Sequence, residues 1–277
     1  MSCPHCDGTR WRQVPDDGVL RVERCPCWRE DAARTLLAAA RVPSRYRACD
    51  LATFVTYENP QLVRAVDRAR RFVEAFPVVD KGLLLIGPPG IGKTHIAVAV
   101  LRQVVSEKRA RGLYYDTRSL LNTIRGTYDP VTRTSAVDVL RPVVEAELLV
   151  LDDLGAERGT DWVEETMNFI VNTRYNDRRP TIFTSNYEDV PDPEAFDSLL
   201  VRVGVRMHSR LREMCEFLEY DGPDYRDFEF PPSSDDLTRM WKAKPRRKLP
   251  AKTSSRARAR LKAGKSDLGW SGGRVGG

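Results

Sequence analysis

The sequence GPPGIGKT at residues 87–94 constrains the fold most, because it matches the phosphate-binding pattern G-x-x-x-x-G-K-[ST] in full. The apolar run LLLI precedes it and the segment HIAVAVLRQVV follows it, as a strand–loop–helix unit requires. In such a unit the glycines let backbone N–H groups close around phosphate oxygens at a helix N-terminus. A Gly- and Pro-rich turn without a ligand is the alternative, and it would not require this spacing.

Two side chains of this motif carry specific expectations. Lys93 is expected to reach the β- and γ-phosphates of ATP, and the Thr94 hydroxyl is expected to bind Mg²⁺. The side chain of His95 is expected to pack rather than to take part in chemistry. The candidate nucleotide-binding residues are Gly87, Pro88, Pro89, Gly90, Ile91, Gly92, Lys93, Thr94 and His95.

Short apolar strands alternate with amphipathic helices from residue 79 to about residue 230, and this alternation predicts an α/β core with a five-stranded parallel sheet. The expected strands are residues 82–87, 113–116, 148–152, 181–185 and 216–220. Three further segments flank this core. They are a cysteine module (1–28), a helical connector (29–78) and a basic tail expected to be disordered (231–277).

Polar residues end two of the expected strands. ELLVLDDLG predicts a buried strand that delivers Asp152 to the Mg²⁺ and Asp153 to the water that attacks the γ-phosphate. Two such residues alone are more typical of a solvated turn, but the upstream phosphate loop favours catalysis. Asp153 stands where many ATPases with a phosphate loop carry Glu. Its side chain is shorter than that of Glu, which predicts slower hydrolysis. Asn186, after TIFTS, is either a turn residue or a group that holds the attacking water or senses the γ-phosphate.

An arginine stripe follows in LVRVGVRMHSRLREM, where Arg202, Arg206 and Arg210 recur every four residues beside an apolar stripe. The spacing predicts a helix that buries one face and presents guanidinium groups next to it, with Gly204 as an interruption. The arginines are either solvated or donated in trans to the nucleotide of a neighbouring subunit.

Four cysteines lie in the first 27 residues, as Cys3-x₂-Cys6 and Cys25-x-Cys27. A turn signal, PDDG, between them predicts a hairpin that brings the pairs together as a four-thiolate Zn²⁺ site. His5 is an alternative ligand, and four free thiols are the alternative to a metal site. Because four thiolates leave no open coordination position, this module is expected to bind protein rather than to catalyse.

The net charge of +6 is unevenly distributed. Residues 242–277 hold 12 Lys and Arg and one Asp, a net charge of +11, which leaves the other 241 residues at −5. The tail therefore either binds nucleic acid without sequence preference or is a solvated tail. No strictly apolar run exceeds the six residues 96–101 and no export signal is recognisable, so a soluble, cytoplasmic protein without a membrane partner is expected.

From about Val42 to Arg226 the sequence resembles the DnaC/DnaI-type helicase loaders, in the IstB-like branch of AAA+ ATPases. GPPGIGKT with LLVLDDLG identifies a P-loop ATPase, and LDDLG with RRPTIFTSN and SRL narrows the resemblance to this branch. The remaining motifs that carry it are VPSRYR, YYDTRSLLNTIRG, TRYNDRR, SRLREMC and GPDYR. The chain departs from the wider AAA+ pattern because it lacks a full helical lid after Arg226, which therefore receives no role.

The resemblance implies roles for particular residues. Asn186 corresponds to the sensor-1 residue, and Arg210 in SRL corresponds to the trans arginine finger, with Arg206 as the second candidate. Arg118 and Arg125 fall in the region that similar proteins use to bind single-stranded DNA. In similar loaders the N-terminal module grips the replicative helicase.

These observations together predict a self-associating ATPase that loads the replicative helicase onto single-stranded DNA, with ATP, Mg²⁺ and Zn²⁺ as cofactors. An IstB-like transposition ATPase, which remodels DNA for a transposase, is the nearest alternative, and the cysteine pairs favour the loader. A small-molecule kinase would need an acceptor-binding lid that the sequence lacks. In a non-catalytic nucleotide switch, Asp153 would position water poorly and binding alone would matter.

Overall fold

The central element is a five-stranded parallel sheet with the strand order β4-β5-β6-β3-β7. The computed structural model describes residues 3–16, 18–129, 135–157, 159–190 and 198–243. The strands are β3 (Gly82–Ile86), β4 (Gly112–Asp116), β5 (Leu148–Asp152), β6 (Thr181–Ser185) and β7 (Cys215–Glu219). The predicted parallel sheet of five strands is therefore confirmed, and each predicted strand is found to within one residue at either end.

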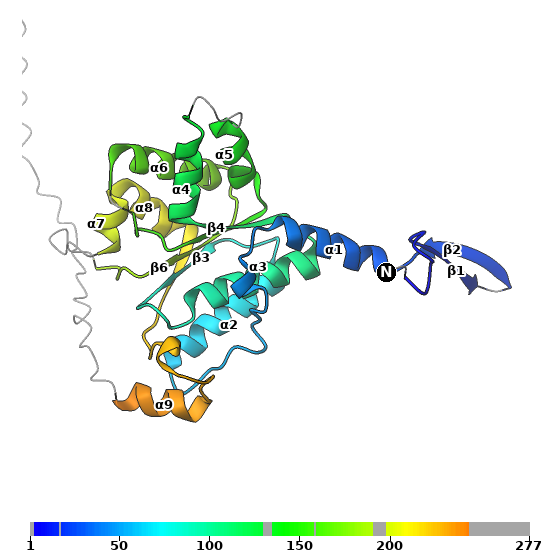
Figure 1. The fold of residues 1–277 in the computed structure, drawn as a ribbon, viewed down its shortest axis with the longest axis horizontal. Helices are drawn as coiled ribbons and strands as arrows, with labels where there is room; N and C mark the ends of the chain where they lie inside the picture. The colour runs from blue at the N-terminus through cyan, green and yellow to red at the C-terminus, as the bar shows by residue number, and fades with distance from the viewer. Residues whose placement is uncertain (1–2, 17, 130–134, 158, 191–197, 244–277) are drawn as a thin grey trace, which may run out of the picture. The chain divides into compact units, whose positions relative to one another are not determined.

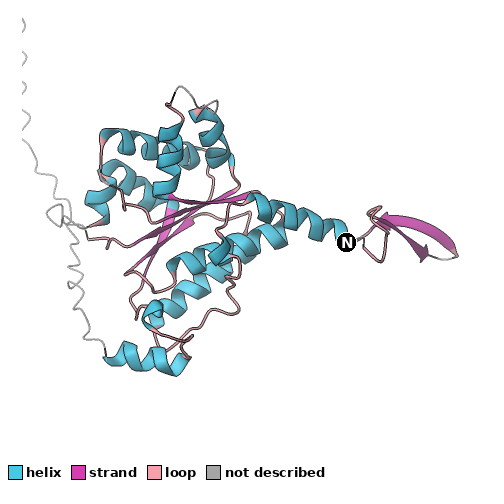
Figure 2. Cartoon of the chain, in the orientation of Figure 1, coloured by secondary structure: helices cyan, strands magenta, loops and turns pink. Residues whose placement is uncertain are grey.

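Helices cover both faces of this sheet (Figures 1 and 2). One face carries α1 (Cys27–Ala39), α2 (Pro60–Ala75) and α3 (Lys93–Lys108). The opposite face carries α4 (Thr117–Gly126), α5 (Ala136–Glu145), α6 (Asp161–Asn176), α7 (Leu199–Val203) and α8 (Val205–Met214). Alternate residues of β3 enter the two layers, with Leu83 and Leu85 on the α2–α3 side and Leu84 and Ile86 on the other. Burial on both faces explains why the strands read as continuous apolar runs.

The segment expected as a connector is part of this core. Asn59 caps α2 by accepting hydrogen bonds from the backbone N–H groups of Gln61 and Leu62. The buried face of α2 then packs in the same apolar cluster as α3. At the other end of the segment, α1 begins at Cys27, so the expected boundary after residue 28 falls inside a helix.

The tail expected to be disordered from residue 231 contains a helix, α9 (Ser234–Ala243), so that prediction is wrong for these ten residues. Leu237 is 3% exposed and joins the α2–α3 cluster, and Trp241 packs edge-on against Tyr57. The burial of these apolar side chains stabilises a helix here, although the polar composition of the segment suggested disorder. Residues 244–277, which hold most of the predicted basic tail, lie outside the described part of the chain.

Two short 3₁₀ turns, Ser44–Tyr46 and Tyr225–Asp227, complete the core, and a separate antiparallel hairpin joins β1 (Trp11–Asp16) to β2 (Val19–Arg24). Among the described helices, none combines the length and the apolar character that crossing a bilayer requires.

A buried arginine joins α5, α6 and β6 at the amino ends of the strands, which is the end of the sheet away from the phosphate loop. Arg174 on α6 is 1% exposed, and its guanidinium donates to the Thr181 hydroxyl at the start of β6. It also donates to four carbonyl oxygens, those of Val143, Val144, Ala146 and Pro180, at 2.7 to 3.2 Å. Three of these carbonyls lie at the C-terminal end of α5, where helical carbonyls have no partner within the helix.

We expect Arg174→Ala to lower the free energy of unfolding by about 3 kcal/mol, because it leaves several buried carbonyl groups without a donor. Urea unfolding measures this loss. Arg71→Ala, which removes an exposed arginine paired with Asp67 on α2, is the matched control and should change it by less than about 0.5 kcal/mol. Equal effects of the two variants would contradict this assignment.

Candidate functional site

The phosphate-binding loop connects β3 to α3 and opens onto a cavity of about 660 Å³. Gly90 has a φ of +81°, and a Cβ there would lie 1.7 Å from Oδ1 of Asp224, so no larger residue fits. The loop thus approaches the segment after β7 closely. This leaves the N-terminal end of α3 facing the cavity, where backbone N–H groups and the helix dipole favour an anion.

Lys93 is the first residue of α3, directly after this loop, and is 6% exposed. Its ammonium group donates to the backbone oxygens of Gly87 and Pro88, at 2.8 and 2.7 Å, and to Oδ1 of Asn186 at 2.7 Å. Burial lowers the pKa of Lys93 to about 8, although the carboxylates of Asp153 and Asp152 oppose that shift. The cation is thus preorganised next to the position where phosphates are expected.

Asp152 ends β5 and is almost fully surrounded by hydroxyl groups. Thr94 Oγ1 donates to Oδ1 at 2.9 Å, Thr184 Oγ1 donates to Oδ1 at 2.6 Å, and the Tyr114 hydroxyl donates to Oδ2 at 2.7 Å. Burial and this neighbouring carboxylate raise the pKa of Tyr114, which keeps the phenol protonated as a donor. Carboxylate and hydroxyl oxygens are the ligands that Mg²⁺ prefers, so Thr94 and Asp152 fit that ion chemically.

Asp153 and Asn186 meet across the ends of β5 and β6. Asn186 Nδ2 donates to Oδ1 of Asp153 at 2.6 Å, while its Oδ1 accepts from Lys93. Asp153 has a φ of +60°, and its backbone N–H donates to the Thr184 hydroxyl at 2.9 Å. Burial, followed by the charge of Asp152, raises the pKa of Asp153. The structure therefore brings Lys93, Asp153 and Asn186 into one chain of hydrogen bonds.

The lining of the cavity also includes aromatic and aliphatic side chains, among them Tyr46, Phe54, Tyr57 and Leu237. His95 lies there with its Nε2 at 3.2 Å from the backbone oxygen of Asp50 and its ring edge-on to Phe54. An aromatic and aliphatic surface of this kind suits a flat heterocyclic base.

Several residues of this site were not predicted from the sequence. Tyr114 and Thr184 bind Asp152 from neighbouring strands, and Arg226 lines the cavity, where it pairs with Asp224 at 2.7 Å. Strand ends that carry tyrosine or threonine give no distinctive pattern. The signal that could have found Arg226 is GPDYR, which the sequence places shortly after the last strand of the sheet.

The remaining candidate residues lie outside the cavity. Arg206 and Arg210 are on α8, and Arg210 Nη1 donates to the backbone oxygen of Arg206 at 3.1 Å. Arg118 on α4 pairs with Glu157 at 2.8 Å, and the Arg125 guanidinium lies over the ring of Trp162 at 4.8 Å.

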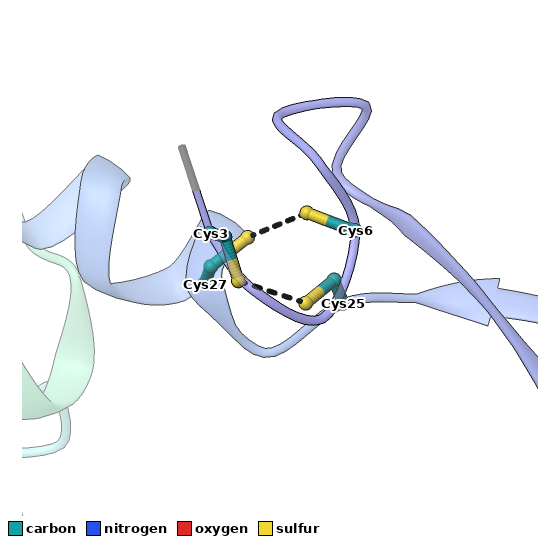
Figure 3. A group of neighbouring side chains, drawn as sticks. All are labelled: Cys3, Cys6, Cys25 and Cys27. Atoms are coloured by element: carbon teal, nitrogen blue, oxygen red, sulfur yellow. Dashed lines mark hydrogen bonds between the residues drawn. The ribbon is translucent and has the colours of Figure 1, made fainter. Parts of the chain in front are cut away.

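The four N-terminal cysteines converge, with all their sulfur atoms within 4.8 Å of one another (Figure 3). Cys3 Sγ lies 3.7 Å from Cys25 Sγ, and Cys6 Sγ lies 3.5 Å from Cys27 Sγ. A tetrahedral zinc ion with Zn–S bonds of about 2.3 Å separates its sulfur ligands by about 3.8 Å. The thiols therefore fit that ion, and the group of metal-ligating side chains found there does not include His5. The hairpin expected between the two pairs is present as β1 and β2.

Comparison with known protein families matches residues 29–227 to the model of the IstB-like ATP binding protein. This range contains every described element from α1 to the 3₁₀ turn at Tyr225–Asp227, apart from the first two residues of α1. The cysteine tetrad and α9 lie outside it.

Curated relatives and solved structures that are similar to the chain include the following three. The uncharacterized protein YqaM of Bacillus subtilis is 24% identical over 203 residues, 70% of this chain and 61% of that protein. The replicative helicase loader DnaC of Escherichia coli is 26% identical over 130 residues, 46% of this chain and 52% of that protein. A crystal structure of the DnaC helicase loader is 36% identical with a TM-score of 0.57, and the match covers 64% of this chain and 99% of that structure. The chain thus spans between half and two thirds of the length of these two curated relatives.

We expect the affinity for ATP to fall as the pH rises above about 8, because Lys93 then loses the charge that attracts phosphates. Between pH 7 and pH 9 the loss should be roughly tenfold, following the charged fraction of one group. Titration with a fluorescent ATP analogue in the presence of Mg²⁺ measures it. Lys93→Ala should bind weakly at every pH with no such dependence, and an equally steep dependence in that variant would contradict the assignment.

Proposed function

The chain belongs to the family of IstB-like ATP-binding proteins, and from this premise we propose that it loads a replicative DNA helicase onto single-stranded DNA in an ATP-dependent reaction. The observation that carries the proposal is the 36% identity to a DnaC helicase loader over nearly all of that solved structure. The same AAA+ core holds a connected nucleotide site at the ends of its strands. Both features support an ATPase whose work is to place another protein on DNA.

In this proposal the phosphate loop and Lys93 bind the β- and γ-phosphates, while Thr94 and Asp152 hold Mg²⁺. The bound ion supplies positive charge that neutralises the phosphates. Asp153 orients the attacking water and accepts its proton, which its raised pKa favours. Asn186 fixes the Asp153 carboxylate through its amide and senses the γ-phosphate through its contact with Lys93.

Hydrolysis in this proposal also requires a second copy of the chain. Arg210, or Arg206, enters the nucleotide site of a neighbouring subunit and stabilises the charge that develops on the γ-phosphate. Both arginines lie on α8, and neither is among the residues that line their own cavity. Their position supports donation in trans and therefore self-association through the nucleotide sites.

The cysteine module is proposed to bind one Zn²⁺ and to grip the helicase. The strand β2 is exposed along its whole length, so the hairpin has little apolar core of its own. Four thiolates on one ion would hold the hairpin together and leave no open coordination position. We propose residues 1–28 as this module, with its last two residues in α1, residues 29–78 as the connector, residues 79–230 as the ATPase core, and residues 231–277 as a basic tail that begins with the packed helix α9.

The DNA-binding part of the proposal rests on Arg118 and Arg125. Both lie on α4, on the face of the sheet opposite α2 and α3. Their present partners, Glu157 and Trp162, hold the two guanidinium groups at the surface. Contact with phosphates by these arginines would give single-strand binding that weakens with salt. A reaction on replicating DNA places the protein in the cytoplasm.

Co-elution from a sizing column with the replicative helicase of the source organism, with ATP and Mg²⁺ present, tests the proposed function. We expect a stable complex at micromolar concentration that Lys93→Ala weakens when ATP is limiting, because this variant binds nucleotide poorly. Arg71→Ala serves as the matched control and should co-elute like the unaltered chain. A chain that hydrolyses ATP yet forms no complex would favour the transposition ATPase, with a transposase as the next partner to test.

We expect about one zinc ion per chain, because four sulfur ligands converge on a single position. Metal analysis of the purified protein measures this content. Cys25→Ser should lower it at least tenfold, whereas Cys49→Ser, which alters a buried cysteine of the ATPase core, should leave it unchanged. A folded hairpin without metal would remove zinc from the proposal.

A further inference from the structure

A short loop after β6 connects the nucleotide site to the helix that bears the arginines. It begins at Asn186, whose side chain contacts Lys93 and Asp153, and reaches Asp189 only three residues later. The Asp189 carboxyl group is 4% exposed and binds two side chains of α8. His208 Nε2 lies 2.6 Å from Oδ1, and the Arg212 guanidinium donates to Oδ2.

The two residues between Asn186 and Asp189 also hold the α7–α8 unit. The Tyr187 ring lies under the Arg202 guanidinium of α7 at 4.5 Å. The Glu188 backbone oxygen accepts a hydrogen bond from the backbone N–H of Leu199, the first residue of α7. Every residue of this loop therefore contacts either the nucleotide site or the helices that follow.

The helical geometry of α8 relates the two contacts of Asp189 to the positions of Arg206 and Arg210. His208 and Arg212 are four residues apart and share one side of the helix, and so do Arg206 and Arg210. The two pairs are offset by two residues, which is about 200° around an α-helix. Asp189 thus contacts the side of α8 that lies opposite Arg206 and Arg210.

Independent contacts anchor the same side of α8 to the sheet. The His208 ring packs edge-on against Phe217 of β7, and the Arg212 guanidinium lies over that ring at 4.8 Å. At the other end of α8, Gly204 has a φ of +79° and separates it from α7. This break interrupts the helical hydrogen bonding between α7 and α8, so side-chain contacts contribute to the orientation of α8. Met207 and Leu211 pack in the core, and Asp189 adds its contacts on the adjacent side.

We propose that Asp189 is a positioning residue for the reaction, which holds α8 so that Arg206 or Arg210 reaches the nucleotide of a neighbouring subunit. The loop from Asn186 to Asp189 would then couple the γ-phosphate contacts of one subunit to the arginines that it presents to the next. This inference rests on the proposed donation of Arg210 or Arg206 in trans. It adds a residue whose effect on turnover is exerted in the neighbouring site.

Asp189→Ala tests this assignment. Asp189 does not line the cavity, so we expect the dissociation constant for ATP to change less than twofold while kcat falls at least tenfold. Asp67→Ala, which removes another carboxylate from an ion pair, on α2, is the matched control and should leave both quantities unchanged. Unchanged kcat in a folded Asp189→Ala protein would overturn the proposal.

Mixing subunits separates an effect in trans from one within the same site. Lys93→Ala has a defective nucleotide site but intact arginines, so adding it should raise the turnover of Asp189→Ala several-fold at constant Asp189→Ala concentration. Arg210→Ala and Arg206→Ala, mixed in the same way, report whether an arginine acts in trans at all. If an arginine variant is rescued and Asp189→Ala is not, the inference is overturned and the trans arginine stands. If neither arginine variant loses activity, the proposed trans arrangement fails and the inference fails with it.

Arg212→Ala keeps the test decisive if Asp189→Ala does not fold. Its side chain is 52% exposed, so its removal releases one of the two partners of Asp189 without leaving a large cavity. We expect a smaller loss of kcat, threefold or more, that the same mixture with Lys93→Ala restores. A loss that the mixture does not restore, or no loss at all, would count against a positioning role.

Discussion

The ammonium group of Lys93 holds together the three strand ends on which the site depends. It binds two backbone oxygens of the loop after β3 and the side chain of Asn186 after β6, and Asn186 in turn binds Asp153 after β5. The strands of a parallel sheet bring their carboxyl ends together, so Asn186 contacts residues that are 33 and 93 positions away in the sequence. A buried cation with three acceptors also fixes the loop before any phosphate is bound, which lowers the cost of ordering it later.

A second buried cation, Arg174, lies at the opposite end of the strands, where β6 begins. Arg174 joins the end of α5 to the start of β6, and three of its five hydrogen bonds go to carbonyl groups at the end of α5. β6 is therefore held at its start by Arg174 and at its end by the contacts of Asn186. Because the strand between them is fully buried, a displacement at one end is transmitted rather than absorbed by flexible side chains.

The sequence predicts the strands well because their apolar runs are bounded by glycine, proline and charged residues. It predicts which loops meet, because parallel strands place their carboxyl ends together. It does not predict Tyr114 and Thr184 around Asp152, since a tyrosine or a threonine in a strand is ordinary until the register of β4, β5 and β6 is known. The sequence does not predict the helix α9, for a different reason. Its apolar residues Leu237 and Trp241 are few, and their burial against α2 and Tyr57 is a tertiary contact.

Under the proposed function, the arrangement of cations divides the reaction between subunits. Lys93 belongs to the nucleotide site of its own chain, and Arg226 also lines that cavity, whereas Arg206 and Arg210 project from α8 outside it. A site that lacks one cation hydrolyses slowly, because the charge on the leaving phosphate is not fully compensated. Turnover would then require a neighbouring subunit whose arginine reaches the nucleotide, so assembly itself would control hydrolysis. Such control would suit the proposed loading function, because ATP would then persist until the helicase has been placed on DNA.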